Sequence, residues 1–141
     1  MKTNIGISEE GRKCVTGILN TLLADEHVIY IKNRNYHWNV TGARFSDLHK
    51  FLEAQYNELA ETIDEVAERV RKIGSVPAGT MKEFTELSNL KEHPGKLPDA
   101  DGMLKDLLTD HETIIRFIRE NIDKVNDECG DAGSADFITG V

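Results

Sequence analysis

The chain has 141 residues, of which 39% are hydrophobic and 30% are charged, which is enough for one domain with its own core. Its apolar runs are shorter than the roughly 20 residues that span a bilayer, and its N-terminus lacks a secretory signal pattern, so we expect no membrane span and no export. The formal net charge is −8, whereas nucleic-acid-binding proteins usually carry a basic surplus.

Two long helices are predicted in the first half of the chain. Ser8 is a candidate N-cap and is followed by two acidic residues, so a helix is expected over about 9–35. Residues 39–42 form a turn signal. A second helix is predicted over 45–73, and Gly74 is its natural C-terminal stop.

The second half of the chain begins with a loop region. All three prolines lie in this stretch, which also has room for a short helix around 81–87. A third long helix is predicted from Asp99 or Asp101 to about residue 129, and Ser134 is a candidate N-cap for a fourth. Long helices joined by one long crossover predict an all-α fold, a four-helix bundle, with residues 1–141 as a single domain.

Four potential metal ligands share one face of the second predicted helix. At about 100° per residue, His49, Glu53, Asp64 and Glu68 fall within an arc of roughly 100°. The i,i+4 pairs His49/Glu53 and Asp64/Glu68 allow two side chains to reach one ion, and imidazole with carboxylate suits iron, manganese or zinc. For any single carboxylate a solvated acidic face is the alternative, because the same helix carries acids on other faces: Glu58, Glu61 and Glu65.

Distance along this helix argues against one site within one chain. Glu53 and Asp64 are separated by about 16 Å along the helix axis, so the two pairs of one helix cannot hold the same ion. If a two-fold mate lays the same helix antiparallel, the His49 end of one chain meets the Glu68 end of the other, and two equivalent sites form per dimer. The chain also lacks the Glu-x-x-His motif of di-iron sites within one bundle.

Four motifs agree in residue type and spacing with one known family. They are N-Y-H-W-N-V-T-G at 35–42, F-x-x-L-H-x-x-x-E at 45–53, D-x-x-A-E-R-V at 64–70 and I-G at 73–74. Together they resemble the Dps family, the miniferritins named as DNA-binding proteins from starved cells. Weaker similarity extends over nearly the whole chain.

This resemblance implies a ferritin-like bundle assembled from two-fold dimers into a hollow dodecamer. Iron(II) would bind at the dimer interfaces and be oxidised there, preferably by hydrogen peroxide, so that the protein acts as a ferroxidase and stores the ferric mineral. His37, His49 and Glu53 would come from one subunit, and Asp64 and Glu68 from its mate. The family often has Asp at the position of Glu53.

The same resemblance assigns roles to residues around these ligands. Asp127 and Asp136 match the acidic lining of three-fold pores that admit iron, although Asp136 is equally well explained as an acidic first-turn residue after Ser134. Tyr36 and Trp38 adjoin the expected iron site, where aromatic side chains can intercept oxidising equivalents. For Trp38, packing at the dimer interface is the favoured alternative.

The alternative function is a DNA-compacting nucleoid protein whose iron chemistry is secondary. DNA-binding members of the family typically carry tails rich in Lys and Arg. Here residues 1–13 contain three basic residues and two acidic ones, and residues 131–141 contain no basic residue. We therefore expect no appreciable duplex binding at physiological salt. A structural or signalling bundle with a vestigial site is a third hypothesis, which the five competent ligand residues argue against.

Two further expectations concern the cysteines and the C-terminal end. Cys14 and Cys129 are far apart and in no CxxC pair, which argues against a disulfide scaffold and a thiolate zinc site and favours a cytoplasmic, possibly nucleoid-associated, location. From Ser134 to residue 141 the sequence supplies only about eight residues of this helix. The fourth helix is therefore expected to be truncated, with one apolar side of the bundle exposed.

Overall fold

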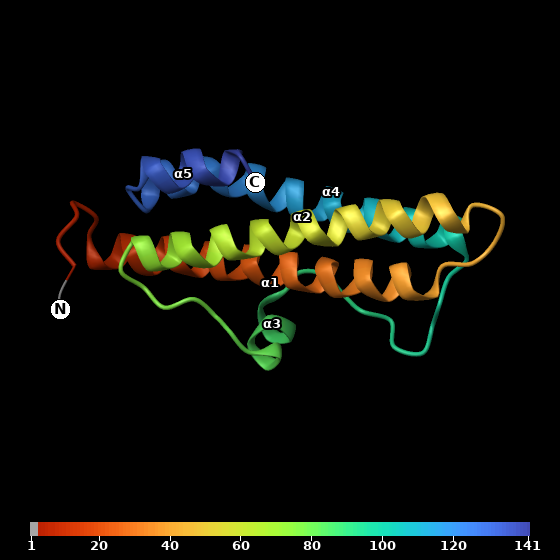
Figure 1. The fold of residues 1–141 in the computed structure, drawn as a ribbon. Helices are drawn as coiled ribbons and strands as arrows, with labels where there is room; N and C mark the ends of the chain where they lie inside the picture. Colours follow the sequence, from red (N-terminus) through yellow and green to blue (C-terminus); the bar gives the residue numbers. More distant parts are fainter. Residues whose placement is uncertain (1–2) are drawn as a thin grey trace.

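The computed structural model describes residues 3–141, and its regular secondary structure is entirely helical (Figure 1). None of the described helices is long and apolar enough to cross a membrane. The elements are α1 (Glu9–Asn39), α2 (Phe45–Lys72), α3 (Met81–Leu87), α4 (Ala100–Asp123), the π-helix η1 (Lys124–Glu128) and α5 (Ala132–Thr139). The predicted all-α class and the short helix in the crossover are therefore confirmed.

Local capping chemistry fixes most helix ends where the sequence predicts them. The Ser8 hydroxyl accepts a hydrogen bond from the Gly11 amide at 2.9 Å, and Asp99 accepts one from the Gly102 amide at 2.8 Å. Gly74 has φ +85°, the left-handed conformation that ends α2. These interactions satisfy backbone donors and acceptors that a helix end leaves free.

Two helix boundaries differ from the prediction. The first helix continues to Asn39, where the side-chain amide donates to the Asn35 carbonyl at 2.8 Å. The last helix is capped by Asp131 and not by Ser134, which lies buried inside it. The Asp131 carboxylate accepts from both the amide (3.2 Å) and the hydroxyl (2.5 Å) of Ser134. A charged acceptor three residues earlier thus takes the capping position.

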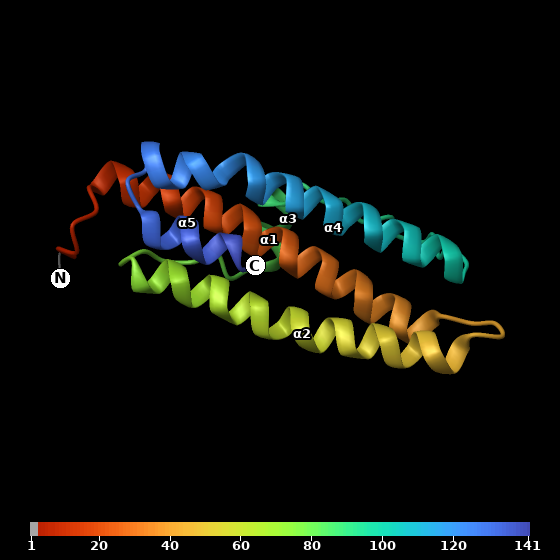
Figure 2. The same ribbon diagram turned by 90° about the horizontal axis from the view of Figure 1, so that it is seen from above.

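The chain runs along the bundle three times before α4 begins. α1 and α2 form an antiparallel hairpin, and the connection that carries α3 returns the chain to the far end (Figure 2). α4 consequently runs parallel to α2, and α5 packs on α4 and η1 near the start of α1. The ferritin-like arrangement expected from the long crossover is therefore present.

The hydrophobic core is built mainly on α1. Its fully buried side chains face those of α2 and α4 along most of its length. Among the largest fully buried side chains of the protein are four on α1 and three on α2: Leu19, Leu22, Leu23, Ile29, Leu52, Val66 and Val70. On α4, Leu108 and Ile115 remain 59% and 51% exposed, and Ile115 borders a cavity that residues of α1 and α2 also line.

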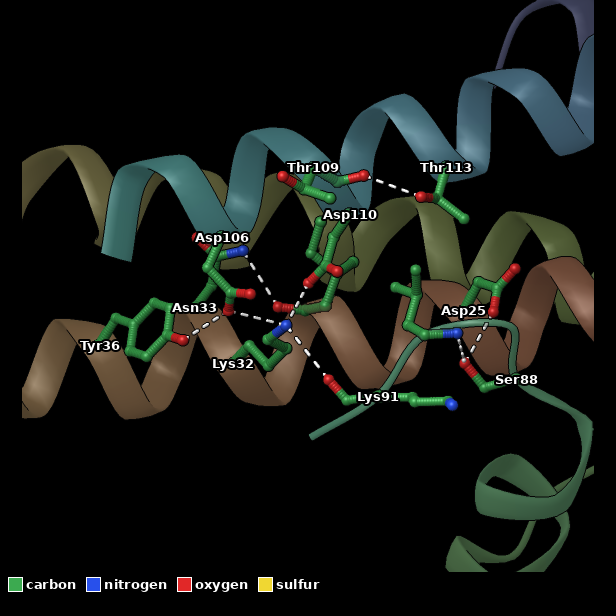
Figure 3. Close-up of polar contacts among 12 residues, drawn as sticks. Asp25, Lys32, Asn33, Tyr36, Ser88, Lys91, Asp106, Thr109, Asp110 and Thr113 are labelled. Atoms are coloured by element: carbon green, nitrogen blue, oxygen red, sulfur yellow. Dashed lines mark hydrogen bonds and ion pairs between the residues drawn. The ribbon is translucent and has the colours of Figure 1, made fainter. Parts of the chain in front are cut away.

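A buried polar cluster fixes the crossover against α1 and α4 (Figure 3). The Lys32 ammonium lies 2.5 Å from Asp110 and 2.8 Å from Asp106, and it donates to the Lys91 carbonyl at 3.3 Å. The Tyr36 hydroxyl donates to Asp106 at 2.5 Å. Burial opposes the charge on Lys32, but hydrogen bonds to the two carboxylates raise its pKa above its usual value.

A second cluster pins the loop after α3. The fully buried Asp25 carboxylate accepts from the Ser88 hydroxyl at 2.7 Å (Figure 3). It also accepts from the Asn89 backbone amide at 2.6 Å. A buried carboxylate is tolerated only when its oxygens are hydrogen-bonded in this way. The connection between α3 and α4 is therefore fixed to α1 by specific polar contacts.

The two cysteines form a disulfide bond, which corrects the expectation drawn from their spacing. Cys14 and Cys129 are 115 residues apart, yet their Cα atoms lie 5.6 Å apart. The reason is topological, because α4 runs antiparallel to α1 and brings its end back to the first turns of α1. Sequence spacing alone does not contain that information.

Glu26 is a buried acid whose protonation is coupled to folding. Its side chain is 4% exposed and borders a cavity of about 240 Å³ together with Glu58 and His111. Burial, with the neighbouring Asp25 charge, raises the pKa of Glu26 from its ordinary 4.5 to about 7. The protonated form is therefore favoured in the folded protein.

The unfolding free energy is expected to fall as pH rises from about 5 to 8, because the pKa of Glu26 is higher in the folded state. Its contribution is complete below the unfolded pKa and is lost as pH rises through about 7. The full effect is about 3 kcal/mol. Urea unfolding across this pH range should show a flatter profile for Glu26→Gln, whereas Glu58→Gln should keep the wild-type slope. Identical slopes for Glu26→Gln and wild type would contradict this assignment.

Candidate metal centre

Two histidines meet where α1 ends and α2 begins. His37 lies in the last turn of α1, and His49 lies in the second turn of α2, so the short connection between the helices brings them together. Their rings stack with centroids 3.7 Å apart and an interplanar angle of 21°. His37 is 8% exposed and His49 is half-buried.

Each histidine is oriented by the backbone of the other. The Nδ1 atom of His37 lies 2.8 Å from the His49 carbonyl oxygen, and Nδ1 of His49 lies 2.9 Å from the His37 carbonyl oxygen. A carbonyl can only accept, so both Nδ1 atoms carry the proton. These hydrogen bonds occupy Nδ1 and leave Nε2 as the nitrogen that can bind a metal, which is the arrangement that outer hydrogen bonds impose on metal-binding histidines.

Aromatic rings surround this histidine pair. Phe45 stacks on His49 with centroids 5.0 Å apart, and Tyr56 meets His37 edge-on at 5.2 Å. Phe45 is nevertheless 46% exposed. The pair thus has aromatic walls from α2, and Phe45 forms an apolar side that is open to the surface.

An arginine that sequence reasoning missed lies next to the pair. The Arg34 guanidinium lies over the rings of Tyr56 at 4.8 Å and Trp38 at 5.3 Å, and it donates to the Tyr30 hydroxyl at 2.9 Å. Tyr30, Arg34 and Trp38 recur at intervals of four, so this half of the cluster was visible in the sequence. The contribution of Tyr56 depends on how α2 packs. Trp38 itself remains 64% exposed.

The predicted carboxylate ligands lie on the exposed surface of α2. Glu53, Asp64 and Glu68 are all exposed, and Glu68 pairs with Lys72 at 3.3 Å. Among residues 3–141, no three His, Cys, Asp or Glu side chains lie close enough to hold one metal ion. Of the five predicted ligands, a single chain therefore brings the two histidines into mutual contact and leaves the carboxylates spread along the helix.

The remaining predicted residues fall into two environments. Asp127 on η1 and Asp136 on α5 are both exposed, and the Asn126 amide donates to Asp127 at 2.7 Å. Tyr36 is buried, and its hydroxyl is directed to Asp106 of α4. Burial and this carboxylate raise the pKa of Tyr36 well above its usual value.

Comparison with known proteins places this bundle in a family. A family model for ferritin-like domains matches residues 16–141. The solved structure of DpsC from Streptomyces coelicolor superposes with a TM-score of 0.93 at 29% identity, over 99% of this chain and 81% of that one. The chain belongs to the Dps family of ferritin-like proteins. The resemblance inferred from the sequence motifs is thereby confirmed.

Other relatives agree in sequence and in structure. A low temperature-induced protein of Nostoc sp. is 45% identical over 99% of this chain and 78% of its own length. The DNA protection during starvation protein 2 of Bacillus anthracis is 34% identical over 92% of this chain and 87% of its own length. The Vibrio cholerae Dps structure, described as a member of the ferritin-like diiron-carboxylate superfamily, has a TM-score of 0.89 at 28% identity, over 99% of this chain and 87% of that one.

Proposed function

We propose that this Dps chain is an iron-storage and oxidative-stress-protection protein whose ferroxidase sites are shared between two copies. The observation that carries the proposal is the reciprocal orientation of His37 and His49, which leaves both Nε2 atoms available. The superfamily description of the Vibrio cholerae relative supports iron as the metal. Glu53 would complete this half of the site, and Asp64 and Glu68 of a second copy would supply the other half.

The exposed surface around the histidines favours a second copy as the partner. Phe45 stacks on His49 and Trp38 follows His37 in the chain, and the two are 46% and 64% exposed. Exposed apolar side chains gathered near a site are typical of protein interfaces. An antiparallel two-fold contact of α2 would cover it and bring the exposed carboxylates of one chain to the histidines of the other. We further propose that such dimers assemble into a hollow dodecamer, with Asp127 and Asp136 lining its pores.

The mixed donor set suits oxidation of iron(II). Carboxylates are hard anionic donors and stabilise iron(III) more than iron(II), while the imidazoles hold the incoming iron(II). Two iron(II) ions together supply the two electrons that reduce one hydrogen peroxide, with two protons, to two waters. No hydroxyl radical is released in this reaction, so storage and protection are linked. The net charge of −8 favours attraction of the cation.

Iron(II) oxidation tests this proposal when anaerobic protein and iron(II) are mixed with either hydrogen peroxide or oxygen. We expect about two iron(II) ions to be oxidised per peroxide added, because the two electrons leave in one event, and we expect a faster reaction with peroxide than with oxygen. Ferric absorbance and residual peroxide should be followed in the same samples, with protein-free buffer as the control. Oxidation at the buffer rate with both oxidants would contradict the ferroxidase assignment.

DNA protection remains the second candidate function. The Bacillus anthracis relative carries DNA protection in its name, so the comparisons do not support the expectation that DNA binding is absent. That expectation stays a prediction based on the acidic net charge and the scarcity of basic residues near both ends of the sequence. Lys2, one of the few basic residues there, lies outside the described residues. A cytoplasmic location likewise remains a proposal.

A further inference from the structure

We propose that Cys14 and Cys129 form a peroxide-sensitive clasp that fastens η1 and α5 to the start of α1. They are the only two cysteines in the sequence and are bonded to each other. This inference rests on the proposed cytoplasmic location, because in a reducing compartment a disulfide is usually formed transiently and senses redox conditions. The proposal concerns the thiols alone and goes beyond the iron chemistry of the histidine site.

The backbone around Cys129 is shaped for this contact. α4 widens into the π-helix η1, where the Cys129 amide donates to the Lys124 carbonyl five residues earlier at 2.9 Å. Such π-helical turns are rare and occur frequently at functional sites. On the opposite side, a Cβ added to Gly11 would lie 2.2 Å from the Cys129 carbonyl oxygen. Only glycine allows α1 to approach Cys129 this closely.

The clasp joins η1 and α5 to α1, with which these two elements make few other contacts. Their side-chain contacts with another helix run to α2, where Arg69 donates to Ser134 at 2.9 Å and pairs with Asp131 at 3.5 Å. The disulfide is their covalent link to α1. α5 has only eight residues, too few to be stable without tertiary support. Opening the disulfide is therefore expected to loosen η1 and α5 together.

One hydrogen peroxide molecule is sufficient to oxidise the two thiols to the disulfide. Cys129 is 3% exposed and Cys14 is only partly buried, so the Cys14 thiolate is the group that peroxide reaches first. Its sulfur attacks the peroxide O–O bond, giving a sulfenic acid and, after protonation, one water. The Cys129 thiol then attacks that sulfur, forming the S–S bond and releasing the second water. The two thiols lose two electrons, and the peroxide gains them.

The decisive experiment uses the iron-free, assembled protein in the presence of a chelator. The protein is reduced, freed of reductant and treated with hydrogen peroxide. We expect about two thiols to disappear per peroxide consumed, with one cross-linked Cys14–Cys129 peptide in a non-reducing digest. Amide exchange over residues 124–139 should be roughly tenfold slower, or more, in the oxidised form than in the reduced form. Cys14→Ser should show the fast exchange under both conditions.

Two results would contradict the proposal of a peroxide-sensitive clasp. One is persistence of the thiols, or their oxidation to sulfinic acid, without the cross-link. The other is equal exchange over residues 124–139 in the oxidised and reduced proteins. Cys14 is not one of the proposed iron ligands, so the Cys14→Ser variant should still oxidise iron(II). Loss of the clasp and loss of ferroxidase activity are therefore separate outcomes.

Discussion

His49→Ala is expected to slow peroxide-driven iron(II) oxidation by roughly tenfold to hundredfold or more, the range found when support around a metal is lost. The substitution removes one imidazole ligand. It also removes the Nδ1–H group of His49, which donates to the backbone carbonyl of His37, and the ring on which His37 stacks. Stopped-flow measurement of ferric absorbance at fixed iron and peroxide gives the rate directly.

Substitutions on α2 separate a ligand effect from a general effect on the helix. Asp64→Asn keeps the side-chain shape but weakens the anionic donor, so it should also slow oxidation. Glu65→Gln, an exposed residue next to it on another face, should leave the rate unchanged. Wild-type rates in both His49→Ala and Asp64→Asn would remove the basis for the proposed site.

Lys32→Met is expected to lower the free energy of unfolding by about 3–5 kcal/mol. The Lys32 ammonium is buried between Asp106 and Asp110, and its loss leaves two carboxylates close together without a cation. The loss also frees the Lys91 carbonyl, which anchors the crossover. Urea unfolding at fixed protein concentration measures the change, because assembly makes apparent stability depend on concentration.

Two controls make this prediction specific. Lys32→Met combined with Asp110→Asn should recover part of the loss, because one uncompensated charge is removed. Lys13→Met removes an ion pair with Glu9 whose side chains are 77% and 56% exposed, so it should cost less than about 1 kcal/mol. If Lys32→Met costs no more than Lys13→Met, the buried cluster does not stabilise the fold as described.

Helix positions were predictable because their signals are local. Ser8, Gly74 and Asp99 end or begin helices through contacts within three residues. The prediction that Ser134 caps the last helix was wrong because Asp131 is a competing N-cap. Arg69 of α2 pairs with Asp131 and donates to Ser134, which stabilises the arrangement with Asp131 as the cap. A local rule cannot rank candidates whose partners come from elsewhere in the fold.

Contacts across the long crossover were not predictable from spacing. The disulfide and the Lys32 cluster both join α1 to residues about 60 to 115 positions away. Their formation depends on the direction in which α4 returns. The Dps motifs did mark His37 and His49 as ligands, but nothing in their spacing of 12 residues indicates that each ring bonds the backbone of the other. The arrangement of a second copy lies beyond any single chain.

Co-assembly of two impaired variants tests the shared site most directly. In a mixed dimer of His49→Ala and Asp64→Ala chains, one site loses both ligands and the other keeps both. Random pairing of equal amounts should therefore restore about a quarter of the wild-type sites and of the iron(II) oxidation rate. Each variant alone should show only the slowed rate expected from the loss of its ligand. If the mixture, shown to contain mixed dimers, is no more active than the separate variants, the ligands of each site belong to one chain and the account is wrong.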